Sequence, residues 1–89
     1  MITGTQIRAA RALLNWSQGK LATNSGVSLP TIKRIEARGH EFGGRVDTLQ
    51  KIQSAVEQAG IVFIQKDAGG GPGVRLGAWE FGGKTNDED

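Results

Sequence analysis

The side chains that could carry out covalent or metal chemistry are few in this sequence. There is no cysteine, and His40 is the only histidine, so no set of nucleophile, base and orienting group appears, and a metal site at His40 with only Glu41 nearby is disfavoured. We therefore expect no enzymatic activity, no metal and no cofactor. The chain does supply basic groups. Lys33 and Arg34 are neighbours in the sequence and lie between the apolar residues Ile32 and Ile35. Ammonium and guanidinium groups bind anions, and the guanidinium fork also fits the edge of guanine.

The charge of the chain is unevenly distributed. Eleven Lys and Arg against nine Asp and Glu give a net charge of +2. Residues 1–45 hold seven bases and two acids, a net +5, whereas residues 46–89 hold four bases and seven acids, a net −3. A basic first half favours a polyanionic partner, although charges can also cluster on an ordinary solvated surface.

The length of the chain limits its organisation. Eighty-nine residues allow one domain, or one domain with a short appendage, and a core this small would gain from a second subunit. No apolar run approaches 18 residues, and no basic-then-apolar leader opens the chain, so we expect a soluble, cytoplasmic protein without a membrane segment.

Helix start signals recur through the first sixty residues. Thr3 followed by Gln6 forms a capping box, and Ser17 and Ser28 each precede a further helix, with Pro30 in the first turn of the latter. A fourth helix is expected to begin near Asp47, with Gln50 as its capping partner, and to end before Gly60.

The pattern changes to strands after Gly60. Residues 61–64 are β-branched or aromatic, and a Gly-rich loop over 67–72 separates them from a second short strand over 74–76, which predicts a β-hairpin. The first strand is apolar on both faces. One face can cover the helices, and the other needs a second subunit or cover from residues 74–81, including Trp79 and Phe81. The dimerisation residues we expect are Ile61, Val62, Phe63 and Ile64.

The segment from Gln18 to Ile35 combines two helices with a turn at Gly26, which is a helix-turn-helix arrangement. Its run SQGKLATNSGVSLPTIKRIE resembles the Xre-type, phage repressor and Cro-like helix-turn-helix family over about residues 3–60. The resemblance implies a mainly α fold, in which a four-helix repressor-like domain (1–60) precedes the hairpin (61–77). It leaves a tail (78–89) whose end we expect to be disordered. The matching positions are Ser17-Gln18, Leu21-Ala22, Gly26-Val27-Ser28, Thr31-Ile32 and Ile35-Glu36, with Arg8 and Arg11 in the first helix.

The third helix has an outward face that can be derived from its spacing. At about 100° per residue, the direction opposite Ile32 and Ile35 is occupied by Pro30, Lys33, Arg34 and Ala37. In the resembled family, this helix reads base edges in the DNA major groove. Carried over, the base-reading residues are Leu29, Pro30, Lys33 and Arg34, with Arg34 placed to bind guanine O6 and N7. The alternative is a solvated helix face without a partner.

Two further groups of residues follow from the resemblance. Arg11 and Glu36 lie at the edge of the buried face of their helices, about 80° and about 70° from the core direction, and the resemblance implies an ion pair that fixes the first helix to the third. Removing one partner would then strand a partly buried charge. Contacts to DNA phosphates are expected from Gln18, Ser28, Thr31, Arg38 and Arg45.

These observations predict a sequence-specific transcriptional regulator. We expect a repressor that binds double-stranded DNA as a homodimer on two half-sites related by a twofold axis. The alternative is an antitoxin-like or anti-activator module that uses the same scaffold to bind a protein through its C-terminal hairpin. A nonspecific nucleoid-type DNA binder is disfavoured by the low net charge of +2.

Overall fold

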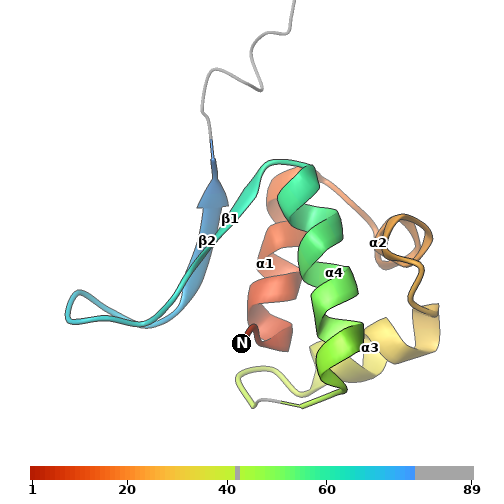
Figure 1. Ribbon diagram of the computed structural model, residues 1–89, viewed down its shortest axis with the longest axis horizontal. Helices are drawn as coiled ribbons and strands as arrows, with labels where there is room; N and C mark the ends of the chain where they lie inside the picture. Colours follow the sequence, from red (N-terminus) through yellow and green to blue (C-terminus); the bar gives the residue numbers. More distant parts are fainter. Residues whose placement is uncertain (42, 78–89) are drawn as a thin grey trace, which may run out of the picture.

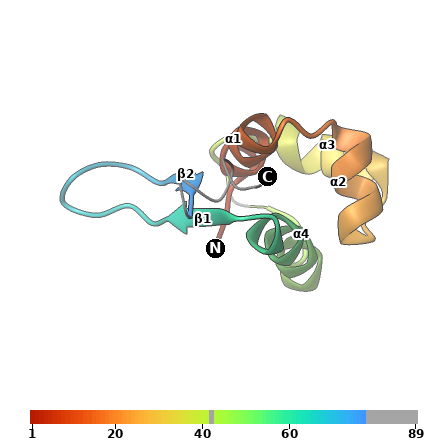
Figure 2. The same ribbon diagram turned by 90° about the horizontal axis from the view of Figure 1, so that it is seen from above.

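Four helices and a β-hairpin make up the computed structural model, which describes residues 1–41 and 43–77. The elements, in chain order, are α1 (Gly4–Leu14), α2 (Gln18–Ser25), α3 (Leu29–Ala37), α4 (Val46–Gln58), β1 (Ile61–Ile64) and β2 (Gly73–Leu76). Helices α1 and α4 stand side by side, with α2 and α3 on one side of them and the hairpin on the other (Figures 1 and 2). The predicted fold, mainly α with a C-terminal hairpin, is confirmed.

Side chains cap the first three helices as the sequence predicted. Both halves of the Thr3–Gln6 capping box are present at α1. Ser17 accepts a hydrogen bond from the Lys20 N–H at the start of α2, and Ser28 accepts one from the Thr31 N–H at the start of α3. Each such cap satisfies a backbone donor that the helix itself leaves free.

The predicted start of α4, near Asp47, is correct to within one residue, but the predicted capping pair of Asp47 and Gln50 is wrong. The helix begins at Val46 after Arg45, and no side chain caps it. Gly44 takes a left-handed backbone conformation, with φ at 98°, so the chain has already turned into the helix before Asp47 is reached. Asp47 lies in the first turn instead, where its carboxylate accepts hydrogen bonds from the Thr48 N–H and from Arg45.

The core fills the space between the four helices and extends to the base of β1. All four helices contribute apolar side chains, which explains why the two shortest helices are stable in this context. The core consists of Ile2, Ile7, Ala10, Leu21, Val27, Ile32, Ile35, Leu49, Ile52, Val56 and Ile61.

The hairpin presents one face to the helices and one to solvent. Its antiparallel register pairs Ile61 with Leu76 and Phe63 with Val74, so these four side chains share the face that packs on the core. Of the four expected dimerisation residues, Ile61 is buried in this core and Phe63 packs against it, whereas Val62 on the opposite face is 40% exposed. The expected cover from Trp79 and Phe81 lies outside the described residues.

Gln6 fastens the hairpin to the helices. Its side-chain oxygen accepts a hydrogen bond from the Thr3 N–H at 3.0 Å, which closes the capping box. Its side-chain nitrogen donates to the carbonyl oxygens of Ile64 at 3.3 Å and Gly73 at 3.1 Å, one on each strand. A buried amide therefore uses both its acceptor and its donors, and it fixes the point from which residues 65–72 extend away from the helices (Figure 1).

Candidate nucleic-acid interface

Helix α3 is buried on one side and open on the other. Ile32 and Ile35 are in the core, and Glu36 is only 3% exposed. The side chains predicted to read bases lie on the open side, where Pro30, Lys33 and Arg34 are exposed and Leu29 is half-buried. The helix thus offers a cationic surface while its opposite side is held firmly by the core.

A chain of hydrogen bonds runs along one flank of α3. The Ser28 hydroxyl donates to Thr31 Oγ1 at 2.9 Å, and the Arg34 guanidinium donates to the same oxygen at 3.3 Å. Ser28 also caps the helix, since the Thr31 N–H donates to its hydroxyl oxygen at 3.4 Å. The two expected phosphate contacts, Ser28 and Thr31, are therefore joined to the expected base-reading residue Arg34.

Three arginines line a cleft between α3 and the start of α4. Arg34, Arg38 and Arg45 are all exposed there, and Thr31, Ile35, Gly44 and Thr48 complete the walls. Arg38 lies across Gly43, because a Cβ atom on that glycine would be 2.6 Å from Arg38 Cδ. Arg45 pairs with Asp47 at 3.1 Å, and this hydrogen-bonded ion pair raises the pKa of Arg45 and lowers that of Asp47. The structure thus brings the arginines expected to contact phosphates beside the helix that is expected to read bases.

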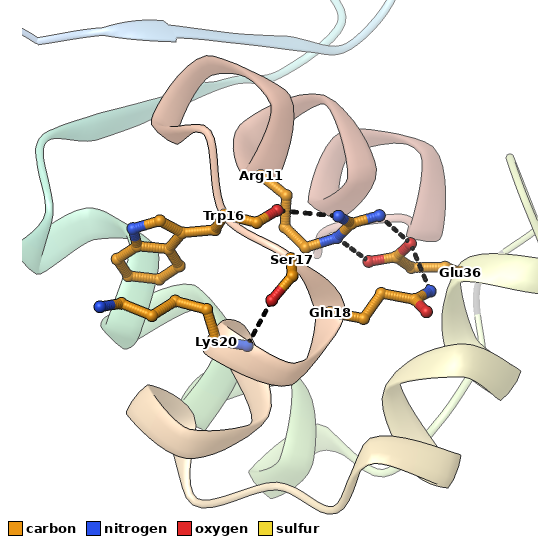
Figure 3. Close-up of polar contacts among 6 residues, drawn as sticks. All are labelled: Arg11, Trp16, Ser17, Gln18, Lys20 and Glu36. Carbon is orange, nitrogen blue, oxygen red and sulfur yellow. Dashed lines mark hydrogen bonds and ion pairs between the residues drawn. The ribbon is translucent and has the colours of Figure 1, made fainter.

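The Arg11–Glu36 pair joins α1 to α3 (Figure 3). Arg11 Nε lies 2.7 Å from one carboxylate oxygen of Glu36, and Arg11 Nη2 lies 2.8 Å from the other, which is a bidentate geometry. The third nitrogen, Nη1, donates to the Trp16 carbonyl oxygen at 2.9 Å. The hydrogen bond to Glu36 raises the pKa of the Arg11 guanidinium above its ordinary value.

Gln18 also belongs to this network. Its side-chain nitrogen donates to Glu36 Oε1 at 3.1 Å, so one carboxylate holds both the end of α1 and the start of α2 (Figure 3). From the sequence, Gln18 was expected to contact a DNA phosphate, and its hydrogen bond to Glu36 was not predicted. Side-chain spacing along one helix could not reveal it, because the two residues lie 18 positions apart on different helices.

Close backbone packing fixes α3 against the start of α1. A Cβ atom on Gly4 would lie 2.3 Å from the Ile35 carbonyl oxygen, so only glycine fits at this contact. The Thr5 N–H donates to the Gly39 carbonyl oxygen at 3.1 Å, just beyond α3. Helix α3 is therefore anchored at its C-terminal end by α1, while its N-terminal end remains open for binding.

A comparison with protein-family models matches residues 7–55 of the chain to a model described as helix-turn-helix. The match covers more than half of the chain and contains α2, α3 and the turn between them. The chain belongs to the Xre/Cro-like helix-turn-helix family. This family consists of DNA-binding regulators and not normally of enzymes, so the chain is a helix-turn-helix regulator that binds DNA. A search of curated proteins found no match.

No helix within residues 1–41 and 43–77 is long and apolar enough to cross a membrane. Within the same ranges, no three His, Asp or Glu side chains gather in a way that could hold a metal ion.

Proposed function

We propose that this helix-turn-helix protein is a sequence-specific transcriptional repressor that reads the DNA major groove with α3. The observation that carries the proposal is the division of α3 into two sides. The core, Glu36 and the Gly4 contact hold one side, and the other presents exposed Lys33 and Arg34. A rigidly held helix with free basic side chains satisfies the main requirement for direct readout of bases.

The DNA contacts we propose fall into two classes. Leu29, Pro30, Lys33 and Arg34 contact base edges, and a bidentate Arg34–guanine contact would discriminate against other bases by roughly 1–3 kcal/mol. Gln18, Ser28, Arg38 and Arg45 contact phosphates. An amide nitrogen carries two hydrogens, so Gln18 keeps one donor for a phosphate after donating to Glu36.

A fluorescence-anisotropy titration tests this assignment. The DNA would be a site selected by the wild-type protein from a random pool, compared with scrambled DNA at fixed salt, because phosphate contacts make affinity depend strongly on salt. We expect Lys33→Glu/Arg34→Glu to abolish the preference for the selected site. The control, Lys51→Glu/Lys66→Glu, changes the net charge equally on α4 and after β1 and should keep that preference. Equal loss in both variants would refute reading by α3.

The outer face of the hairpin supports a homodimer. Val62 is 40% exposed, and the alternation of the strand places Ile64 on the same face. We propose that residues 61–77 form the dimerisation element behind a DNA-binding domain of residues 1–60. A dimer would set half-sites about one helical turn apart, roughly 34–36 Å. The protein would act on DNA in the cytoplasm.

Sedimentation equilibrium tests the dimer directly. Val62→Asp places a charge on the proposed interface and should shift the protein to monomers. Val46→Asp is a matched control, since Val46 is 57% exposed at the start of α4, away from the hairpin. A wild-type protein that stays monomeric at tens of micromolar would rule out the hairpin dimer.

A second candidate function rests on the same outer face. If Val62 and Ile64 bind another protein, the chain would act as an antitoxin-like or anti-activator module. Val62→Asp would then abolish function in cells while Lys33→Glu/Arg34→Glu would leave it intact. The repressor proposal requires Lys33→Glu/Arg34→Glu to abolish function.

A further inference from the structure

We infer that Thr31 is a positioning residue that presets the guanidinium of Arg34 for base reading. The inference rests on the proposed function, because it takes Arg34 as the base-reading group. It changes the role of Thr31 from a general contributor to affinity into a determinant of specificity.

The hydrogen-bonding capacity of Thr31 carries the argument. A hydroxyl oxygen offers two lone pairs and one proton. Thr31 Oγ1 accepts from the Ser28 hydroxyl at 2.9 Å and from Arg34 Nη2 at 3.3 Å, so both lone pairs are occupied. The lone pairs of this oxygen are therefore committed to Ser28 and Arg34 of its own helix, which is the arrangement that a support for the guanidinium requires.

The position of Thr31 on α3 determines where along the helix the Arg34 guanidinium is held. Residues three apart face each other on a helix, so Ser28, Thr31 and Arg34 form one line along its flank. Thr31 lies one turn closer than Arg34 to the N-terminal end of α3, the end that enters the major groove in helix-turn-helix proteins. The contact therefore draws the Arg34 guanidinium toward the bases before DNA arrives.

Threonine is suited to this task because it is stiff. Its β-branch restricts the χ1 angle, and the Ser28 hydroxyl bond selects one rotamer further. Thr31 is also half-buried, whereas Ser28 and Arg34 are exposed. A long arginine side chain gains from a fixed support, since ordering a rotamer-rich side chain on binding costs roughly a two- to tenfold factor in affinity.

The test separates base preference from affinity. Binding of Thr31→Val, Thr31→Ser and wild type would be measured on the selected DNA site and on its three variants at the base pair where Arg34→Ala loses preference. A bidentate arginine discriminates there by roughly five- to 150-fold. We expect Thr31→Val to lose about two- to tenfold of this preference. Thr31→Ser keeps the hydroxyl but not the β-branch, so it should lose less than Thr31→Val. Thr48→Val, which changes another half-buried threonine of the same cleft, should keep the preference.

Two controls keep the inference falsifiable. Thermal unfolding must be the same in Thr31→Val and wild type, and the double variant Thr31→Val/Arg34→Ala should show no more loss of preference than Arg34→Ala alone. Equal weakening on every DNA, with a smaller salt dependence, would show a phosphate contact and overturn the inference. Unchanged preference in Thr31→Val would overturn it too. A wild type without any base preference would instead refute the proposed function itself, and the inference with it.

Discussion

Replacing Arg11 by methionine tests whether the α1–α3 ion pair holds the fold together. The side chain of Arg11 is 16% exposed and that of Glu36 is 3% exposed. Arg11→Met removes both bonds to the carboxylate and leaves Glu36 with Gln18 as its remaining side-chain donor. Stranding one member of a buried pair costs about 3–5 kcal/mol, and we expect the lower end because Gln18 stays in place.

This cost is large for so small a protein. At 0.05–0.15 kcal/mol per residue, a chain of 89 residues has a total stability of roughly 4–13 kcal/mol. A loss of about 3 kcal/mol would lower the melting temperature by about 12–24 °C. Urea unfolding followed by circular dichroism would measure the change in midpoint.

Two further variants make the prediction specific to burial. Arg45→Met removes one partner of an exposed ion pair, whose side chains are 81% and 60% accessible, and should not shift the urea midpoint measurably. Arg11→Met/Glu36→Leu removes both buried charges and should be more stable than Arg11→Met alone. The reasoning would be refuted if Arg11→Met behaved like Arg45→Met, or if the double variant lost more stability than the single one.

Further predictions concern packing, hairpin attachment and pH. Gly4→Ala should destabilise the folded chain by about 1–3 kcal/mol, because there is no space for a Cβ atom at this position. Gly19→Ala should stabilise it by roughly 0.5–1 kcal/mol, because its Cβ meets only Ser17 Oγ at 3.7 Å. Urea midpoints that shift in the same direction in both variants would contradict this reasoning. Gln6→Met should speed hydrogen exchange of the hairpin amides by roughly tenfold or more, since two hydrogen bonds of about 1 kcal/mol each are lost; unchanged exchange would refute the anchor. Because Arg45 lowers the pKa of Asp47, Arg45→Ala should raise that pKa in an NMR titration. The Arg45–Asp47 pair stabilises the folded chain when the pH is above the pKa of aspartate in the unfolded chain. This stabilisation is lost as the pH falls through the lower pKa that Asp47 has in the folded chain.

The features predicted correctly from the sequence are those determined by residues a few positions apart in the chain. Thr3, Ser17 and Ser28 cap helices that begin one residue later, so local patterns are sufficient to find them. The cap of α4 was predicted wrongly because the chain enters the helix just after Gly44, so Asp47 lies in the first turn and does not cap it.

The parts of the site that escaped prediction depend on contacts between distant residues. Gln18 meets Glu36 only after α1, α2 and α3 have packed, so its spacing within α2 pointed to solvent and DNA. The second role of Gln6, as donor to the hairpin, was hidden for the same reason. The sequence identified the outward face of α3 correctly, since that face follows from helical geometry once Ile32 and Ile35 are buried.

The Gln6 anchor has a consequence for the order in which the protein assembles during synthesis. Its capping partner Thr3 is three residues away, but its carbonyl partners follow 58 and 67 residues later in the chain. On the ribosome, the four helices are complete before Gly73 exists, and the amide donors of Gln6 remain hydrated until then. The hairpin is therefore the last element to close, and we expect β1 and β2 to exchange their amide hydrogens through a local opening that leaves the helices intact.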